Sequence, residues 1–191
     1  MDRERTLLLA VFIVSSLCGG ILNTYVASQR YSVMYMWGDW AYIPDGVYLV
    51  RIYNGSLMLE RMPDPVFIFG TPFIGSRPLG DRSVLFFYSK QCGATNAFKD
   101  VLENVLSRYQ GIEIYVTACT DLSDPARGCM DRGARGLVMA MGVNGSFPFT
   151  PDMVVVRGGE KLYLHDFAAR YASSNTTIVE LVMRFIEEAT R

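Results

Sequence analysis

The sequence has little of what metal centres and nucleic-acid-binding surfaces need. Among 191 residues there is one histidine, His165, and none of the four cysteines form a C-x-x-C pair, so we expect no metal site. The net charge is −1 and the 15 arginines are scattered without a basic run, which gives no reason to expect a nucleic-acid partner. A phosphate-binding loop, a serine triad and paired carboxylates are also missing, so the sequence indicates no resident cofactor.

Charge is missing from a long stretch near the N-terminus as well. Residues 6–27 contain no charged side chain, and as a helix they would span about 33 Å, enough for a bilayer core of about 30 Å. Arg3 and Arg5 precede the stretch, which predicts a cytoplasmic N-terminus and an extracytoplasmic domain. We therefore expect a cytoplasmic tip and a transmembrane anchor over residues 1–29. A signal peptide cleaved near Val26-Ala27-Ser28 is the alternative.

Residues 30–82 are predicted to form a small β module ahead of the main domain. The module opens with aromatic side chains between Tyr31 and Tyr42, which suit a membrane interface or, equally, the first strand of the folded part. Asn54-Gly55 lies between two runs of strand-forming residues and predicts a hairpin with a type I′ turn. Prolines and glycines over residues 63–81 predict an irregular connector with at most one edge strand.

Residues 83–191 show the order of elements expected of an α/β domain. An apolar strand over Ser83–Tyr88, a helix and a second apolar strand over Ile112–Thr117 predict a parallel pair. A short helix, a hairpin and a C-terminal helix opened by a capping box of Thr177 and Glu180 follow. The sequence thus predicts an α/β fold with a central mixed sheet and helices on both faces.

Cys92 lies in the stretch VLFFYSKQCGAT, beyond the first buried strand and at the start of the next helix. The free N–H groups and the positive dipole end of a helix N-terminus stabilise a thiolate. This placement indicates a reactive cysteine. A buried cysteine that packs as a small apolar residue is the alternative.

Cys119 and Cys129 bracket the polar loop TDLSDPARG. Outside the cytoplasm such a pair is expected to form a disulfide that closes a short loop. Because Cys119 follows the second parallel strand, a bond between Cys92 and either of these cysteines is an alternative, as are free thiols.

Three stretches together, FFYSKQCGAT, FTPDMVVV and the terminal GGEKLYL with its helix, resemble the thioredoxin family over residues 83–191. The resemblance implies a thioredoxin-like sandwich in which Cys92 matches the nucleophile and Pro151 the cis-proline that presents backbone to a peptide. Thr95 stands where the family has the second cysteine of its C-x-x-C motif. It can hydrogen-bond the thiolate or serve as an ordinary residue of the first helical turn.

These observations predict a membrane-anchored, extracytoplasmic thioredoxin-like protein that takes part in thiol–disulfide exchange through Cys92. Its partners would be the bilayer and a protein that carries a thiol or a disulfide. The alternative is a non-catalytic thioredoxin-like accessory subunit of a membrane complex, which the loss of the second cysteine favours. His165 precedes Asp166 and ends a predicted strand remote from Cys92, so we expect it to be structural.

Overall fold

The computed structural model of the chain describes residues 33–68, 71–74, 77–79, 83–108, 112–157, 159–173 and 176–189. The membrane anchor predicted over residues 6–27 lies outside this part of the chain. Within the described residues, no helix is both long and apolar enough to cross a bilayer.

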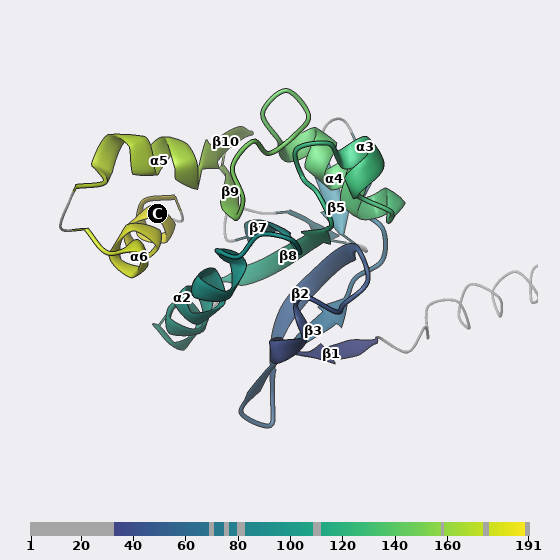
Figure 1. Ribbon diagram of the computed structural model, residues 1–191, viewed down its shortest axis with the longest axis horizontal. Helices are drawn as coiled ribbons and strands as arrows, with labels where there is room; N and C mark the ends of the chain where they lie inside the picture. Colours follow the sequence, from purple (N-terminus) through teal and green to yellow (C-terminus); the bar gives the residue numbers. More distant parts are fainter. Residues whose placement is uncertain are drawn as a thin grey trace, which may run out of the picture. The chain divides into compact units, whose positions relative to one another are not determined.

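A mixed sheet of seven strands forms the centre of the described part (Figure 1). In spatial order the strands are β1 (Met34–Met36), β3 (Ser56–Arg61), β2 (Gly46–Tyr53), β8 (Glu113–Cys119), β7 (Ser83–Ser89), β9 (Asp152–Arg157) and β10 (Glu160–Tyr163). Strands β7 and β8 are parallel, and every other neighbouring pair is antiparallel. The predicted α/β class with a central mixed sheet is confirmed.

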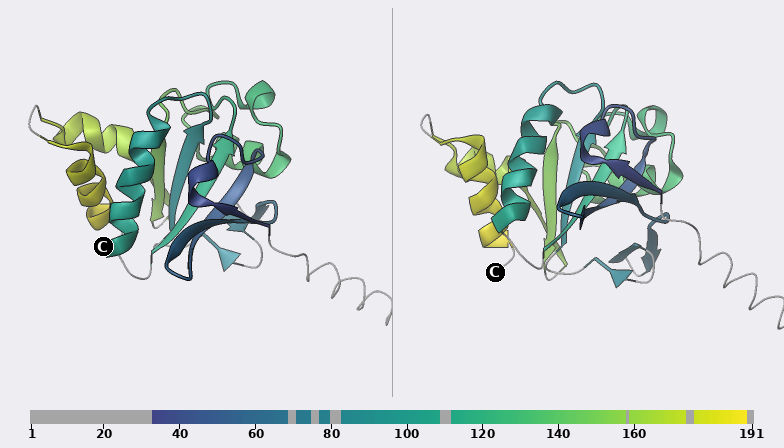
Figure 2. Two further views of the ribbon diagram at one scale, coloured as in Figure 1. Left: turned by 60° about the horizontal axis from the view of Figure 1, so that its bottom comes forward. Right: turned by 90° about the horizontal axis from the view of Figure 1, so that it is seen from below.

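Helices cover both faces of this sheet (Figure 2). The first face packs against α2 (Thr95–Arg108), α5 (Leu164–Tyr171) and α6 (Ile178–Ala189), and the second against α4 (Arg132–Met141). Because side chains of a strand alternate, β7 contributes to both apolar clusters. Phe86 and Tyr88 belong to the first cluster, whereas Leu85 and Phe87 belong to the second. This explains why β7 is apolar along its whole length.

The hairpin predicted from Asn54-Gly55 is present as β2 and β3. Both turn residues have positive φ, 49° and 79°, as a type I′ turn requires. Strand β2 also pairs with β8, from Gly46 opposite Ala118 to Leu49 opposite Tyr115. The sequence predicts this hairpin in a module separate from residues 83–191, whereas the structure joins the two parts in one sheet.

The aromatic segment that opens this part of the chain contributes to the core. After β1, a 3-10 turn over Trp37–Asp39 leads to Trp40, and the two tryptophan rings are 7% and 2% exposed. The Trp40 ring packs against Phe86 and Tyr88, with centroids 5.5 and 4.8 Å away. Of the two alternatives for this segment, the structure has the first strand, although Tyr42 is 89% exposed.

The connector contains more regular structure than the sequence predicted. Strands β4 (Val66–Ile68), β5 (Thr71–Ile74) and β6 (Arg77–Pro78) form a separate antiparallel sheet of three strands. These strands are two to four residues long. Runs this short, interrupted by proline and glycine, show no period in the sequence.

The C-terminal region begins its last helix as predicted but contains an unpredicted helix before it. The Thr177 N–H donates to a carboxylate oxygen of Glu180 at 3.0 Å, and the Glu180 N–H donates to the Thr177 hydroxyl at 3.3 Å, so the capping box is confirmed. Helix α5 follows β10 directly and begins at Leu164. Its buried residues are only Leu164 and Phe167, too few to show a helical period.

The predicted disulfide between Cys119 and Cys129 is confirmed. It joins the end of β8 to the residue after the short helix α3 (Pro125–Gly128). Both cysteines are at most 1% exposed and pack in the apolar cluster under α4. The bond therefore ties the loop over residues 120–128 to the core.

We expect replacement of both Cys119 and Cys129 by alanine to lower the free energy of unfolding by about 3 kcal/mol, because the unfolded chain regains the freedom of a ten-residue loop. Urea unfolding monitored by circular dichroism measures this loss. Cys92→Ala is the matched control and should cost less than about 1 kcal/mol. Equal losses in the two variants would contradict the role assigned to the disulfide.

Candidate functional site

Cys92 lies in the turn between β7 and α2, where the parallel strands β7 and β8 end. It is half-buried and is the only free cysteine among the described residues. Its backbone N–H donates to the Ser89 carbonyl at 3.0 Å, and its carbonyl accepts from the Thr95 N–H at 3.1 Å. The sequence predicts Cys92 at the start of the helix. In the structure α2 begins at Thr95, so Cys92 lies three residues before the helix.

The Cys92 thiol contacts a loop that is distant in the sequence. Its Sγ donates to the carbonyl oxygen of Thr150 at 3.1 Å, although the two residues are 58 positions apart. The peptide bond between Thr150 and Pro151 is cis, and β9 begins at the next residue. The Cys92 thiol therefore contacts the residue before Pro151, which brings these two predicted site residues to one corner of the sheet.

Thr95 lies beside Cys92 but is bonded elsewhere. Its side chain is buried, and its hydroxyl donates to the carbonyl oxygen of Ser89 at 3.2 Å. The one hydrogen of the hydroxyl is therefore directed to the backbone of β7 and not to the sulfur. In this arrangement Thr95 fixes the start of α2 to the end of β7.

A hollow of about 150 Å³ opens next to the Cys92 thiol. The lining residues are Trp40, Ala41, Tyr88, Lys90, Gln91, Cys92, Gly93 and Thr95. The buried Tyr88 hydroxyl donates to the Trp40 carbonyl at 2.7 Å. Burial raises the pKa of Tyr88 well above its ordinary value of 10.0, so this phenol stays a neutral donor over the physiological pH range.

Lys90 supplies the positive charge nearest to Cys92 in the sequence, but a carboxylate compensates it. The Lys90 Nζ lies 2.6 Å from an oxygen of Asp45, and the other oxygen of Asp45 accepts from the Met130 N–H at 2.8 Å. The Lys90 N–H also donates to the Cys119 carbonyl at 2.9 Å. These bonds connect the Cys92 turn to the residue before β2 and to both ends of the disulfide loop.

The disulfide and the hollow beside Cys92 adjoin different apolar clusters. Tyr88, which lines the hollow, belongs to the apolar cluster under α2, whereas Cys119 and Cys129 belong to the cluster under α4. Ser89, three residues before Cys92, pairs with Cys119 in the sheet. The alternative bonds between Cys92 and either cysteine are not present in this structure.

Asp152, the residue after Pro151, was missed by the sequence analysis. It is 2% exposed, and its carboxylate lies 2.6 Å from Nδ1 of His165 and accepts from the Met153 N–H at 2.8 Å. Burial raises the pKa of Asp152, and the hydrogen bond with His165 opposes that rise. Asp166, the neighbour that the sequence suggested, lies 3.5 Å from Nε2 of His165.

His165 is therefore bound to the strand that follows the site loop, and it lies in the first turn of α5 instead of at a strand end. Asp152 and His165 are 13 residues apart, and the residues around each of them predict only the end of a strand or helix. No signal in the sequence predicted the pair. Among the described residues, no cluster of three or more histidine, cysteine, aspartate or glutamate side chains is arranged to bind a metal ion.

Comparison of the chain with protein-family models, with curated proteins and with solved structures gives no match. The function is therefore inferred from the corner that Cys92, Thr150 and Pro151 form. The fold around this corner and the hydrogen bonds within it are the observations on which that inference rests.

We expect Tyr88→Phe to lower the free energy of unfolding at pH 7 by about 1–2 kcal/mol, because the Trp40 carbonyl loses its buried donor. Above about pH 10 the unfolded chain releases the Tyr88 proton while the folded chain keeps it. Wild-type stability should therefore approach that of the variant by up to about 1.4 kcal/mol per pH unit. Urea unfolding from pH 7 to 11 tests this. Tyr42→Phe, at an exposed ring, should follow the wild-type curve.

Asp152→Ala should lower the free energy of unfolding by about 2–3 kcal/mol, since it leaves the Met153 N–H and the buried side of His165 without their acceptor. Asp152→Asn keeps one acceptor oxygen and should cost less. Asp166→Ala is the matched control, because its side chain is 62% exposed and should change stability by less than about 0.5 kcal/mol. If both alanine variants lose stability equally under thermal unfolding, the assignment of the buried pair is wrong.

Proposed function

We propose that the protein is a thioredoxin-like thiol–disulfide exchange protein whose reacting group is Cys92. The observation that supports this most directly is the contact of the Cys92 thiol with the Thr150 carbonyl at 3.1 Å, next to the cis bond of Pro151. A free cysteine, a hollow and the start of β9 are thus combined at one corner.

The order of the strands supports the same proposal. Strands β8, β7, β9 and β10 are consecutive in the sheet, with β7 and β8 parallel and the other two pairs antiparallel. Helix α2 connects the parallel pair, and α6 follows the terminal hairpin with α5 between them. A parallel pair extended by an antiparallel hairpin, with Cys92 after the first strand and Pro151 before the hairpin, is what the resemblance to the thioredoxin family implies.

In the proposed reaction the Cys92 thiol loses its proton to solvent and the thiolate attacks one sulfur of a partner disulfide. A mixed disulfide forms, the bond between the two partner sulfurs breaks, and the second partner sulfur leaves as a thiolate. Attack by a further thiol on the mixed disulfide returns Cys92 to its reduced state. That thiol comes from the substrate or from another protein, since Cys119 and Cys129 are bonded to each other.

In this proposal the neighbours of Cys92 hold the thiol and its turn in place and take no part in the bond changes. Thr95 fixes the helix start through its bond to Ser89. The Thr150 carbonyl holds the thiol at rest, and the adjoining backbone offers hydrogen-bonding groups to an extended peptide. Lys90, paired with Asp45, keeps the turn in place.

A non-catalytic accessory subunit is the second candidate. It is favoured by the absence of a second free thiol among the described residues and by the hydroxyl of Thr95, which is bonded to backbone away from the sulfur. In either function we propose an extracytoplasmic, membrane-anchored protein. The buried disulfide supports this location, because such bonds persist in oxidising compartments.

Cys92→Ser is expected to abolish exchange. The assay follows the reduction of a disulfide-linked peptide by glutathione, and the wild-type chain should accelerate it at least about tenfold over the variant. Cys18→Ser is the matched control, because it makes the same substitution at a cysteine outside the described residues and leaves Cys92 in place. Mass spectrometry should find the trapped mixed disulfide on Cys92 alone.

A rate that is the same for the wild-type chain and for Cys92→Ser would contradict the exchange reaction. That result, together with an unchanged association of the variant with its membrane partners, would favour the accessory subunit.

A further inference from the structure

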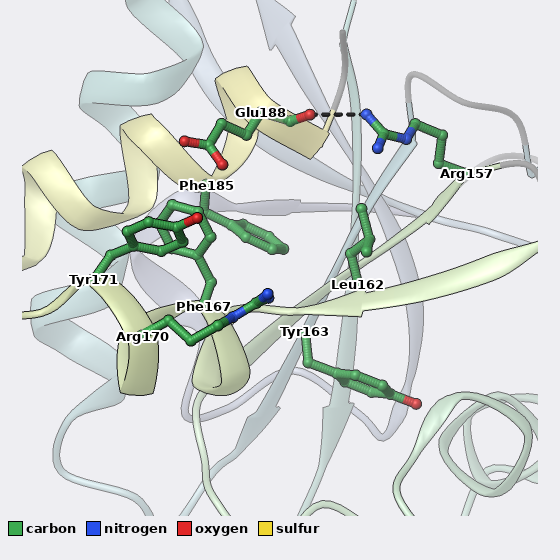
Figure 3. A pocket seen from close by; sticks show the side chains of 8 residues that line it. All are labelled: Arg157, Leu162, Tyr163, Phe167, Arg170, Tyr171, Phe185 and Glu188. Carbon is green, nitrogen blue, oxygen red and sulfur yellow. Dashed lines mark hydrogen bonds between the residues drawn. The ribbon is translucent and has the colours of Figure 1, made fainter.

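A second hollow, which we call the α5–α6 hollow, lies beside the edge strand β10 (Figure 3). The lining residues are Arg157, Leu162, Tyr163, Phe167, Arg170, Tyr171, Phe185 and Glu188. Its volume is about 180 Å³, below the several hundred Å³ of most small-molecule pockets. The hollow therefore has room for one large side chain of a partner and not for a whole cofactor.

The inner wall of the α5–α6 hollow is apolar. Phe167 and Phe185 are buried, their rings packed with centroids 5.6 Å apart, and Leu162 of β10 is half-buried beside them. The Tyr163 hydroxyl donates to the Met141 carbonyl and is directed away from the two phenylalanines (Figure 3). An apolar side chain inserted here would be removed from water by its packing against Leu162 and the two phenylalanines.

The rim of the same hollow is positively charged. Arg157 donates to the backbone carbonyl of Glu188 at 2.9 Å, and Arg170 donates to the backbone carbonyl of Asp166 at 3.3 Å. Within the part of the chain that the structure describes, neither arginine forms a salt bridge with a carboxylate. The Glu188 carboxylate is bonded to Arg184 at 3.3 Å. The two arginines are thus available to carboxylates of a partner.

The sheet edge gives the partner a defined path. Among the described residues, β10 is the last strand of the sheet and pairs on one side only, with β9. The free side of such an edge strand can accept an extended peptide through backbone hydrogen bonds. Leu162 and Tyr163 of this strand line the hollow. A segment that runs along β10 therefore passes the hollow and both arginines.

We propose that the α5–α6 hollow docks an extended polypeptide segment in which one large apolar side chain is flanked by carboxylates. The apolar side chain occupies the space over Phe167 and Phe185, and the carboxylates bind Arg157 and Arg170. This surface is separate from the proposed exchange site. Strand β9 leads from Asp152, beside Pro151, to Arg157, a distance of about 17 Å at 3.3 Å per residue.

The test uses the full chain and a fluorescein-labelled peptide, Gly-Asp-Phe-Asp-Gly, with binding followed by fluorescence anisotropy. We expect saturable binding. Peptides with asparagine in place of both aspartates, or with alanine in place of phenylalanine, should bind at least about fivefold more weakly. Arg170→Ala should weaken binding of the original peptide by a similar factor, and Arg170→Lys by less.

Arg127→Ala is the matched control, since Arg127 is an exposed arginine on α3, outside the α5–α6 hollow. It should bind the peptide like the wild-type chain, and so should Cys92→Ser, which separates this proposal from the exchange function. Circular dichroism verifies that each variant is folded.

Three results would overturn the proposal: no binding of the peptide, equal binding of the asparagine peptide, or equal losses in Arg170→Ala and Arg127→Ala. A fourth is binding of phosphatidylserine vesicles, sensitive to Arg170→Ala, without binding of the peptide. That result would assign the arginines to a lipid surface.

Discussion

The parallel pairing of β7 with β8 is the constraint on which the rest of the structure depends. Seven residues of each strand are in register, from Ser83 opposite Glu113 to Ser89 opposite Cys119. A parallel pair needs a connection that crosses one face of the sheet, and here α2 is that connection. Parallel strands are typically covered on both faces, and α4 covers the other face. Parallel pairing also makes the two strands end at the same edge. Cys92 and the disulfide lie at that edge for this reason.

The end of β7 then determines where the Cys92 thiol lies. The Ser89 carbonyl accepts from both the Cys92 N–H and the Thr95 hydroxyl, while the Ser89 hydroxyl donates to the Thr120 carbonyl at 2.6 Å. One residue thus connects the turn, the helix and the neighbouring strand. The two bonds to the Ser89 carbonyl are local, so the residues next to Cys92 in the chain help to set its backbone conformation. The contacts with Thr120 and Thr150 come from segments that are distant in the sequence.

The features that could be predicted are the ones that local chemistry decides. Asn54-Gly55 requires positive φ, the seven residues of β7 require burial on both sides, and the spacing of Cys119 and Cys129 suits a bond that closes a short loop. The joining of β2 to β8 was not predicted, because strand pairing depends on partners far apart in the sequence. The aromatic segment before β2 showed the same limit: its residues suit water, lipid and core alike, and only the sheet decides between them.

The candidate site was predictable to the same extent. Cys92 and Pro151 could be named because each stands in a recognisable stretch, whereas the bond of Asp152 to His165 needs β10 and α5 to return to the start of β9. The use of the Thr95 hydroxyl could not be predicted either, since a hydroxyl at a helix start has several acceptors within reach. What decided it was the position of the Ser89 carbonyl, which depends on the end of β7.

Because Cys92 is the only free thiol among the described residues, we propose that the exchange depends on a thiol from another chain. The mixed disulfide at Cys92 is released only when a thiol from elsewhere attacks it, and that step is slow when the second chain is dilute. A docking surface about one strand length away would raise the local concentration of a partner without any contact at the sulfur. The two proposals are therefore connected. The partner supplies the thiol that the C-x-x-T sequence lacks, and the α5–α6 hollow, at the Arg157 end of β9, binds that partner.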